Sequence, residues 1–225
     1  MRKTVAIGIQ SFDKIRKDGY FYIDKTGFIR EWWESGDDVT LITRPRRFGK
    51  TLNMSMLEAF FSVSYADRSD LFEGLSIWQD EKYRTLQGTY PVIFLSFTEI
   101  KESVYQSAKN KIYQLITDLY EKITFLLEVR DISEENRRFF LSVGMDMPEY
   151  VATRALHKLS ELLSRHYGKK VIILLDEYDT PMQESYVKGY WDELVDFTRS
   201  LFNSTFKTNP YLERAIMTGI TRVSK

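Results

Sequence analysis

One run of the sequence constrains the fold more than any other, namely residues 39–56, VTLITRPRRFGKTLNMSM. Its apolar start, Val39–Thr43, has the length of a strand, and Gly49-Lys50-Thr51 then opens a segment with helical spacing. A strand, a Gly-Lys-Thr turn and a helix in this order are the context of a phosphate-binding loop, in which backbone N–H groups at the helix start surround phosphate oxygens. We therefore expect Lys50 to reach the β- and γ-phosphates of a nucleotide and the Thr51 hydroxyl to bind Mg²⁺.

The first position of this loop departs from the standard pattern. That pattern has a glycine five residues before Gly49, where this chain has Arg44. Pro45 removes one backbone donor and restricts Arg44 toward an extended conformation, so we expect the first half of the loop to leave the usual phosphate-cradling path. Arg44, Arg46 and Arg47 admit two interpretations, because they either supply positive charge to a polyphosphate or form a solvated basic loop.

The composition places the chain among ordinary globular proteins and excludes several classes of site. The 225 residues suffice for one large domain, and 43% of them are hydrophobic. Equal numbers of acidic and basic residues give no overall attraction to nucleic acid or membrane, so only the local RPRR segment offers a basic patch. The absence of cysteine excludes disulfides and thiolate metal sites, and the two histidines, His157 and His166, do not make a histidine-rich zinc site. With no signal peptide and no run of membrane-spanning length, the sequence indicates a cytoplasmic protein.

Apolar runs of strand length alternate along the chain with segments of helical spacing. We expect strands at residues 39–43, 90–97, 171–175 and 214–220, and a short strand or extended segment at 20–23. We expect helices near 12–17, 27–33, 50–63, 103–128, 137–143, 149–166 and 186–206, with 64–90 largely irregular. The run at 171–175 has five consecutive apolar residues, which is typical of a strand buried on both faces. The alternation predicts an α/β fold with a parallel sheet between helical layers.

A second group of candidate site residues follows the third and fourth of these strands. Asp176 lies at the carboxyl end of its strand, where open parallel sheets place their ligands, and could hold Mg²⁺ opposite the Thr51 hydroxyl. Glu177 could polarise a water for attack on a γ-phosphate, although an Asp-Glu pair after a strand is also a common polar turn. Thr218, at the tip of the fourth strand, could contact the γ-phosphate or the attacking water, and the structural and functional interpretations are equally supported. Arg222 could read the γ-phosphate state, but a solvated surface residue is the favoured interpretation.

The spacing of the two motifs adds information about the sheet. A strand-like run at 90–97 lies between the phosphate loop and the Asp-Glu strand. This fits the division of phosphate-loop ATPases in which an extra strand separates the two motifs and a glutamate follows the magnesium aspartate.

Four segments together carry a resemblance to a known family: GIQSFDKIRKDGYFYIDKT, LITRPRRFGKTLNMSML, VIILLDEYDTP and AIMTGITRVSK. They resemble the AAA-ATPase-like proteins of bacteria and archaea, which have a degenerate RPRRFGK[ST] loop and a DEYD acidic motif. The similarity extends from Ile7 to Lys225 and implies one P-loop NTPase domain over residues 1–225, a three-layer sandwich of the AAA/ASCE type. Members of this family usually continue past the TGI motif, often into a PD-(D/E)XK-nuclease-like domain, so we expect this chain to stop before the fifth core strand.

The resemblance also implies roles for individual residues. It assigns ATP and Mg²⁺ as cofactors, catalysis to Glu177 and Lys50, and metal binding to Thr51 and Asp176. Thr218 is added to the catalytic candidates because of its position at the strand tip. The expected nucleotide contacts are Arg46, Arg47, Phe48, Gly49, Lys50, Thr51 and Leu52. The segment 1–38 is placed to cover the adenine. Asp179 belongs to the acidic motif without a known role, and capping of the next helix is its simplest interpretation.

The leading functional interpretation is a Mg²⁺-dependent ATPase domain whose ligands are ATP and ADP. The alternative is a nucleotide-gated switch or interaction module that binds ATP with negligible turnover, and a protein partner or a homo-oligomer would suit either. Nucleic-acid binding through RPRR has weaker support, because the neutral chain offers little electrostatic footprint.

Overall fold

Four parallel strands form the central sheet of the protein, in the spatial order β1-β4-β3-β2. The computed structural model describes residues 4–128 and 132–221, and the statements below refer to these residues. The strands are β1 Val39–Thr43, β2 Val92–Ser96, β3 Val171–Asp176 and β4 Leu212–Gly219. β4 is hydrogen-bonded to both β1 and β3, so it is β4, and not the run at 90–97, that separates the two motif-bearing strands in the sheet. The prediction of a parallel α/β fold is confirmed. The prediction of an extra strand between the two motifs rested on the run at 90–97, which instead forms the edge strand β2.

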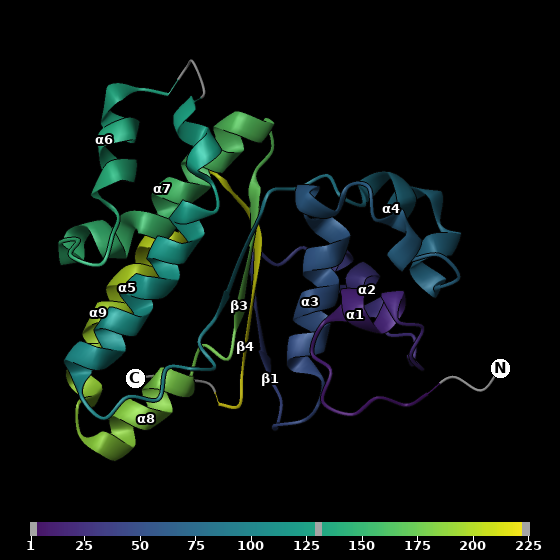
Figure 1. The fold of residues 1–225 in the computed structure, drawn as a ribbon, viewed down its shortest axis with the longest axis horizontal. Helices are drawn as coiled ribbons and strands as arrows, with labels where there is room; N and C mark the ends of the chain where they lie inside the picture. Colours follow the sequence, from purple (N-terminus) through teal and green to yellow (C-terminus); the bar gives the residue numbers. More distant parts are fainter. Residues whose placement is uncertain (1–3, 129–131, 222–225) are drawn as a thin grey trace.

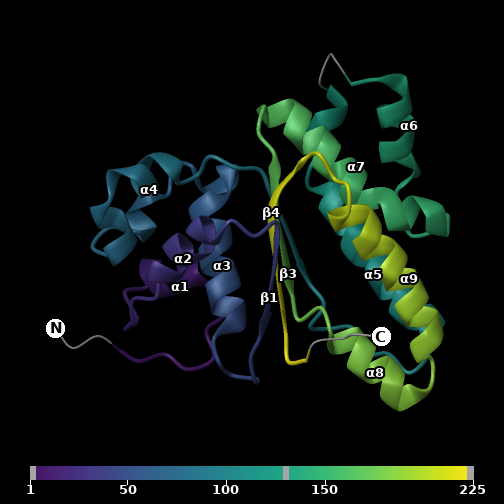
Figure 2. The same ribbon diagram turned by 180° about the vertical axis from the view of Figure 1, so that it is seen from behind.

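Helices cover both faces of this sheet, so the molecule has three layers (Figures 1 and 2). One face carries α1 Phe12–Lys17, α2 Gly27–Ser35, α3 Lys50–Phe61 and α4 Glu81–Leu86. The opposite face carries α5 Tyr105–Glu121, α6 Glu134–Ser142, α7 Glu149–Tyr167, α8 Thr180–Lys188 and α9 Trp191–Phe206. Short 3₁₀ turns lie at Val63–Tyr65, Ser69–Leu71, Ser76–Gln79 and Thr124–Glu128.

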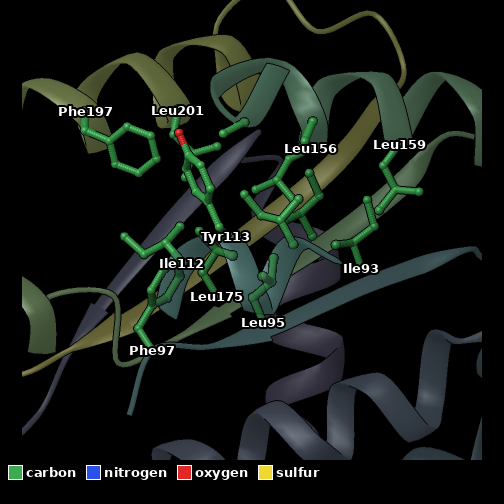
Figure 3. Close-up of a cluster of buried hydrophobic side chains, with 14 of the residues drawn as sticks. Ile93, Leu95, Phe97, Ile112, Tyr113, Leu156, Leu159, Leu175, Phe197 and Leu201 are labelled. Carbon is green, nitrogen blue, oxygen red and sulfur yellow. The ribbon is translucent and has the colours of Figure 1, made fainter. Parts of the chain in front are cut away.

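The central strand β3 divides the hydrophobic core between the two faces. All six of its residues are buried, as predicted for a strand covered on both sides. Because side chains alternate along a strand, Ile173 and Leu175 pack with α5, α7 and α9, where Figure 3 shows Leu175 beside Leu95 of β2. Ile172 and Leu174 pack instead with the layer that contains α3. The sheet is thereby held rigidly on both faces, which fixes the positions of its strand ends.

One glycine ends a helix where the sequence prediction ran through. The region 186–206, predicted as one helix, is two helices, α8 and α9, and α8 starts earlier at Thr180. Gly189 has a φ of 83° and ends α8 in the left-handed conformation, while Pro181 in its first turn marks the start. Both signals are visible in the sequence, but the continuous apolar spacing masked them.

Other boundaries shifted for local reasons. Residues 20–23 form no strand, since Phe21 makes only one backbone bond, from its N–H to the Thr4 carbonyl at 2.9 Å. α4 was not predicted, and its start is capped by Asp80, whose carboxylate accepts from the Lys82 N–H at 3.0 Å. Ser133 caps α6 in the same way, so this helix begins before the predicted residue 137. β2 was predicted to be a buried strand. It is instead an edge strand in which buried and half-buried residues alternate.

Candidate functional site

The carboxyl ends of the parallel strands meet at one edge of the sheet, the lower edge in Figure 1. A cavity of about 560 Å³ opens there. Residues 46, 47 and 49–52, from the loop and the start of α3, form one wall, Glu177 and Thr180 a second, and Thr98 and Lys101, after β2, a third. Such an edge is where open parallel sheets bind ligands, because loops and helix starts converge on it.

The phosphate loop owes its shape to two residues with positive φ. Gly49 has a φ of 76° and precedes α3 directly, so the helix begins at Lys50 with its free N–H groups toward the cavity. Arg47 also has a positive φ, 68°, which is uncommon for a residue with a side chain. The Arg44 N–H donates to the Gly219 carbonyl at 3.1 Å, so the start of the loop continues the ladder between β1 and β4.

The Lys50 side chain is enclosed by three oxygen acceptors. Its Nζ donates to the Arg44 carbonyl at 2.9 Å and to the Pro45 carbonyl at 3.3 Å. The same Nζ lies 3.1 Å from Oε1 of Glu177, and the residue is only 7% exposed. Lys50 therefore joins the phosphate loop to the acidic motif after β3, two segments that the sequence prediction placed in one site from separate evidence.

Asp176, at the end of β3, is bonded to both α3 and β4 through its carboxylate. Its Oδ2 accepts from the Thr51 hydroxyl at 2.7 Å, and its Oδ1 accepts from the Thr218 hydroxyl. The Thr218 oxygen in turn accepts from the Glu177 N–H at 3.2 Å. Asp176 is fully buried and Thr218 is 2% exposed, so these bonds are shielded from water. The hydroxyl pair around one carboxylate is an oxygen-only donor set of the kind that Mg²⁺ prefers.

Glu177 sits in an unusual backbone conformation at this edge. Its φ is 53°, in the left-handed region that costs a non-glycine residue free energy. This conformation follows β3 directly, and the side chain both pairs with Lys50 and lines the cavity. Strained residues of this kind cluster at functional sites, where the surrounding bonds hold them in place.

The basic loop residues take different positions. Arg46 and Arg47 line the cavity, and neither guanidinium forms an ion pair with another part of the chain that the structure describes. Arg44 and Phe48 are exposed, Phe48 to 62%, and they are outside the cavity lining. Leu52, the last predicted contact, does line it.

Part of the N-terminal segment also borders the cavity. The sequence predicted this role for residues 1–38 as a whole, without indicating which of them lie at the site. Residues 7–10 pass the foot of α3, as Figure 1 shows, and line the cavity opposite the acidic motif. Nearby, the Tyr22 hydroxyl accepts from the Lys25 N–H at 3.3 Å and donates to Sδ of Met56 at 3.2 Å. Burial raises the pKa of Tyr22 to about 12, so the hydroxyl keeps this proton.

Several residues at the site were not predicted. Thr98, Lys101 and Thr180 lie on the cavity wall, and the position of Thr98 just beyond a strand end was the available signal. Arg222, which was considered as a sensor of the γ-phosphate, lies outside the described residues.

The sheet order, the Gly-Lys-Thr loop after β1 and the acidic pair after β3 together define a P-loop-like three-layer sandwich. The model of the family described as Predicted AAA-ATPase matches residues 6–225, and the chain belongs to this family. Membership implies nucleotide binding in general.

One curated relative extends this comparison. It is an "Uncharacterized protein in vnfD 5'region" of Azotobacter chroococcum mcd 1, 30% identical over 226 aligned positions. The alignment covers the whole of this chain and 38% of the relative. The chain therefore spans well under half of that protein's length. No solved structure matches the chain. Within the described ranges, none of the helices combines the length and apolar character needed to cross a bilayer.

Proposed function

We propose that this chain binds ATP together with Mg²⁺ and hydrolyses the γ-phosphate. One observation carries the proposal: direct contacts join Lys50, Thr51 and Glu177, which line one cavity, to the buried residues Asp176 and Thr218. A cavity of about 560 Å³ has the size of a ligand site.

Lys50 has the position and the charge to bind the β- and γ-phosphates. Its present acceptors, two loop carbonyls and Glu177, are the groups that phosphate oxygens would replace. The N–H groups at the start of α3 add a favourable dipole for an anion. Arg46 and Arg47 on the same wall add positive charge without competing partners.

Thr51 and Asp176 fit a magnesium site. The Thr51 hydroxyl and one carboxylate, 2.7 Å apart, match the ion's preference for few protein oxygens supplemented by phosphates and water. When bound, Mg²⁺ neutralises charge that develops on the phosphate oxygens. Thr218 holds the other carboxylate oxygen of Asp176 and so keeps the carboxylate oriented.

Glu177 is the candidate for orienting the attacking water. It borders the cavity, and its backbone is held by the bond from its N–H to Thr218. When the phosphates take over Lys50, the Glu177 carboxylate becomes free to accept a hydrogen bond from water. Residues 7–10 and Leu52 would cover the adenine and ribose, since they form the part of the wall away from the acidic motif. The proposal places this activity in the cytoplasm.

The switch interpretation has one specific observation in its favour. Lys50, the candidate phosphate-binding cation, and Glu177, the candidate base, form an ion pair with each other at 3.1 Å. If Glu177 stays near Lys50 with nucleotide bound, ATP would bind without turnover and the protein would act as a nucleotide-gated interaction module, with a protein partner or a second copy as its target.

Two measurements on the wild-type chain separate these possibilities. Calorimetry with ATP and ADP, with Mg²⁺ and with chelator, tests binding, and phosphate release under the same conditions tests turnover. Magnesium-dependent binding and phosphate release above the level of Glu177→Gln support the ATPase, while binding without release supports the switch. Failure to bind either nucleotide would reject both, and the RPRR segment would then be tested for nucleic acid by the salt dependence of binding.

A further inference from the structure

Asp179, the last residue of the acidic motif, makes contacts that helix capping does not explain. It occupies the N-cap position of α8, yet its side chain makes no cap hydrogen bond to that helix backbone. Its Oδ2 instead accepts from the Ile220 N–H at 2.9 Å, the Thr221 N–H at 2.8 Å and the Thr221 hydroxyl at 3.0 Å. The Gln183 amide also donates to Oδ2, at 2.8 Å. The fully buried carboxylate thus bonds mainly to the chain that leaves β4.

The preceding residues of the motif contact the same segment. The Tyr178 N–H donates to the Thr218 carbonyl at 3.0 Å, and the Tyr178 hydroxyl donates to the Thr221 carbonyl at 3.2 Å. Asp176 and Glu177 both bond to the Thr218 hydroxyl oxygen, as described above. Each residue of 176–179 is therefore hydrogen-bonded to residues 218–221, and we call this set the β3–β4 clamp.

Gly219 shows how closely the two segments approach. A Cβ added there would lie 2.6 Å from Oδ1 of Asp179 and 3.0 Å from the Tyr178 ring, distances that a real side chain does not tolerate. Oδ1 has no hydrogen-bond partner among the described residues and is packed against this glycine. A buried carboxylate with one unsatisfied oxygen is costly, so the bonds at Oδ2 must hold it strongly in place.

We propose that Asp179 is a positioning residue for catalysis, because it fixes the end of β4 and thereby sets the Thr218 hydroxyl against Asp176 and Glu177. This inference rests on the function proposed above. Asp179 does not line the cavity and acts only through Thr218 and its neighbours. Lys50 and Thr51 belong to α3 and make no direct hydrogen bond to Asp179 among the described residues, so we expect them to stay in place without it.

The two parts of the site should therefore respond differently to Asp179→Ala. ADP affinity depends on the loop and α3, so it should stay within about threefold of wild type, a change of well under 1 kcal/mol at the usual tenfold per 1.4 kcal/mol. Turnover per binding site should fall about 10- to 100-fold, since small displacements of positioned groups have effects of this order. The preference for ATP over ADP should also fall, because Thr218 holds Asp176 and Glu177, the two residues proposed to act at the γ-phosphate through Mg²⁺ and water.

A second variant and a matched control keep this test independent of folding. Thr221→Val removes one donor from an exposed residue and should show the same split to a smaller degree. Asp179→Asn keeps one acceptor oxygen and should restore most of the turnover lost in the alanine variant. Glu161→Ala removes another nearly buried carboxylate, which pairs with Lys158 and Arg165 far from the cavity. It should lower Tm without changing turnover per site or the ATP-to-ADP preference.

Hydrogen exchange of the Ile220 and Thr221 amides provides a readout that needs no catalysis. Both amides should exchange faster in Asp179→Ala and keep the wild-type rate in Glu161→Ala. If Asp179→Ala resembles Glu161→Ala in turnover per site and in nucleotide preference, Asp179 is structural only and the proposal is wrong. Equal losses of ATP and ADP affinity would also overturn it. If the wild type binds ATP without turnover, the proposed hydrolysis fails, and the ATP-to-ADP preference together with amide exchange still decides the role of Asp179.

Discussion

The two halves of the candidate site are built in opposite ways. The phosphate loop, residues 44–49, is mostly exposed, and its arginines extend without ion pairs to the rest of the described chain. The centre of the β3–β4 clamp is buried, with Asp176 and Asp179 at 0% and Thr218 at 2% exposure, and only its end at Thr221 is exposed. Every residue of the motif 176–179 is fixed by hydrogen bonds to the next strand.

The difference assigns different tasks to the halves. An exposed loop with unpaired cations can adapt to a polyphosphate, and its energy of binding will depend on salt. A buried network holds its groups in one geometry, which is what stabilisation of a transition state requires. Lys50 is the exception, since it belongs to the loop half but lies buried against Glu177. The predictions below test this division from the largest expected effect to the smallest.

Glu177→Gln should separate binding from chemistry. Glutamine keeps the size of the side chain but cannot take a proton from water, so kcat should fall about 10²- to 10⁴-fold while ATP affinity stays near wild type. Phosphate release and calorimetry measure the two effects. Glu193→Gln, an exposed site on α9, is the control for the charge change. Unchanged turnover in Glu177→Gln would remove this residue from catalysis.

Lys50→Ala should show that the loop half depends on one buried cation. The loss of its charge should weaken ATP about 100-fold, or about 2.7 kcal/mol, because hydrogen bonds to charged groups are the strong ones. Circular dichroism should show an intact fold, and exposed Lys111→Ala on α5 should bind ATP as wild type does. If Lys50→Ala binds ATP with the affinity of the wild type, the phosphate-loop assignment is wrong.

Gly219→Ala should reveal the tight packing of the clamp. The added methyl group meets Asp179 at 2.6 Å, so we expect a loss of about 1–3 kcal/mol in the free energy of unfolding, as for other overpacked sites. Gly144→Ala is the matched control, since a Cβ there has nothing within 4 Å. Urea unfolding measures the free energy of unfolding of both variants. Equal values for the two would mean that the clamp accommodates the added methyl group without loss of stability.

Replacing Arg46 and Arg47 together by glutamine should produce the smallest change. Exposed charges contribute little each, so ATP should weaken about 3- to 10-fold, and ADP less, because the γ-phosphate carries the additional charge. The salt dependence of ATP binding should become flatter. Arg138→Gln with Arg154→Gln removes the same charge from exposed positions outside the cavity. Equal losses for the two nucleotides would leave RPRR as a solvated loop or a site for another polyanion.

Local pattern was enough to predict the elements that flank the site. Val39–Thr43 is a strand with the predicted bounds, and β3 is buried on both faces as its five consecutive apolar residues indicated. Glu149 begins α7 as expected, and Gly168 ends it in the left-handed conformation. These features depend on side chains within a few residues of one another, which a sequence displays directly.

The expected grouping of Lys50, Thr51, Asp176, Glu177 and Thr218 followed from motif order and from the rule that strand ends converge. The structure brings these residues together, while their catalytic roles remain predictions. The break between α8 and α9 was missed because apolar spacing continues through Gly189, although the glycine itself was the signal.

The sequence by itself determined the fold class, the strands that bear the two motifs and the residue types of the site, because these follow from periodicity and short-range chemistry. Only the tertiary structure decided which strand lies beside β1, that Lys50 is buried against Glu177, and that Asp179 bonds to the end of β4. Those contacts join residues 41 to 127 positions apart, and nothing in a local pattern encodes which distant donor a buried carboxylate will meet.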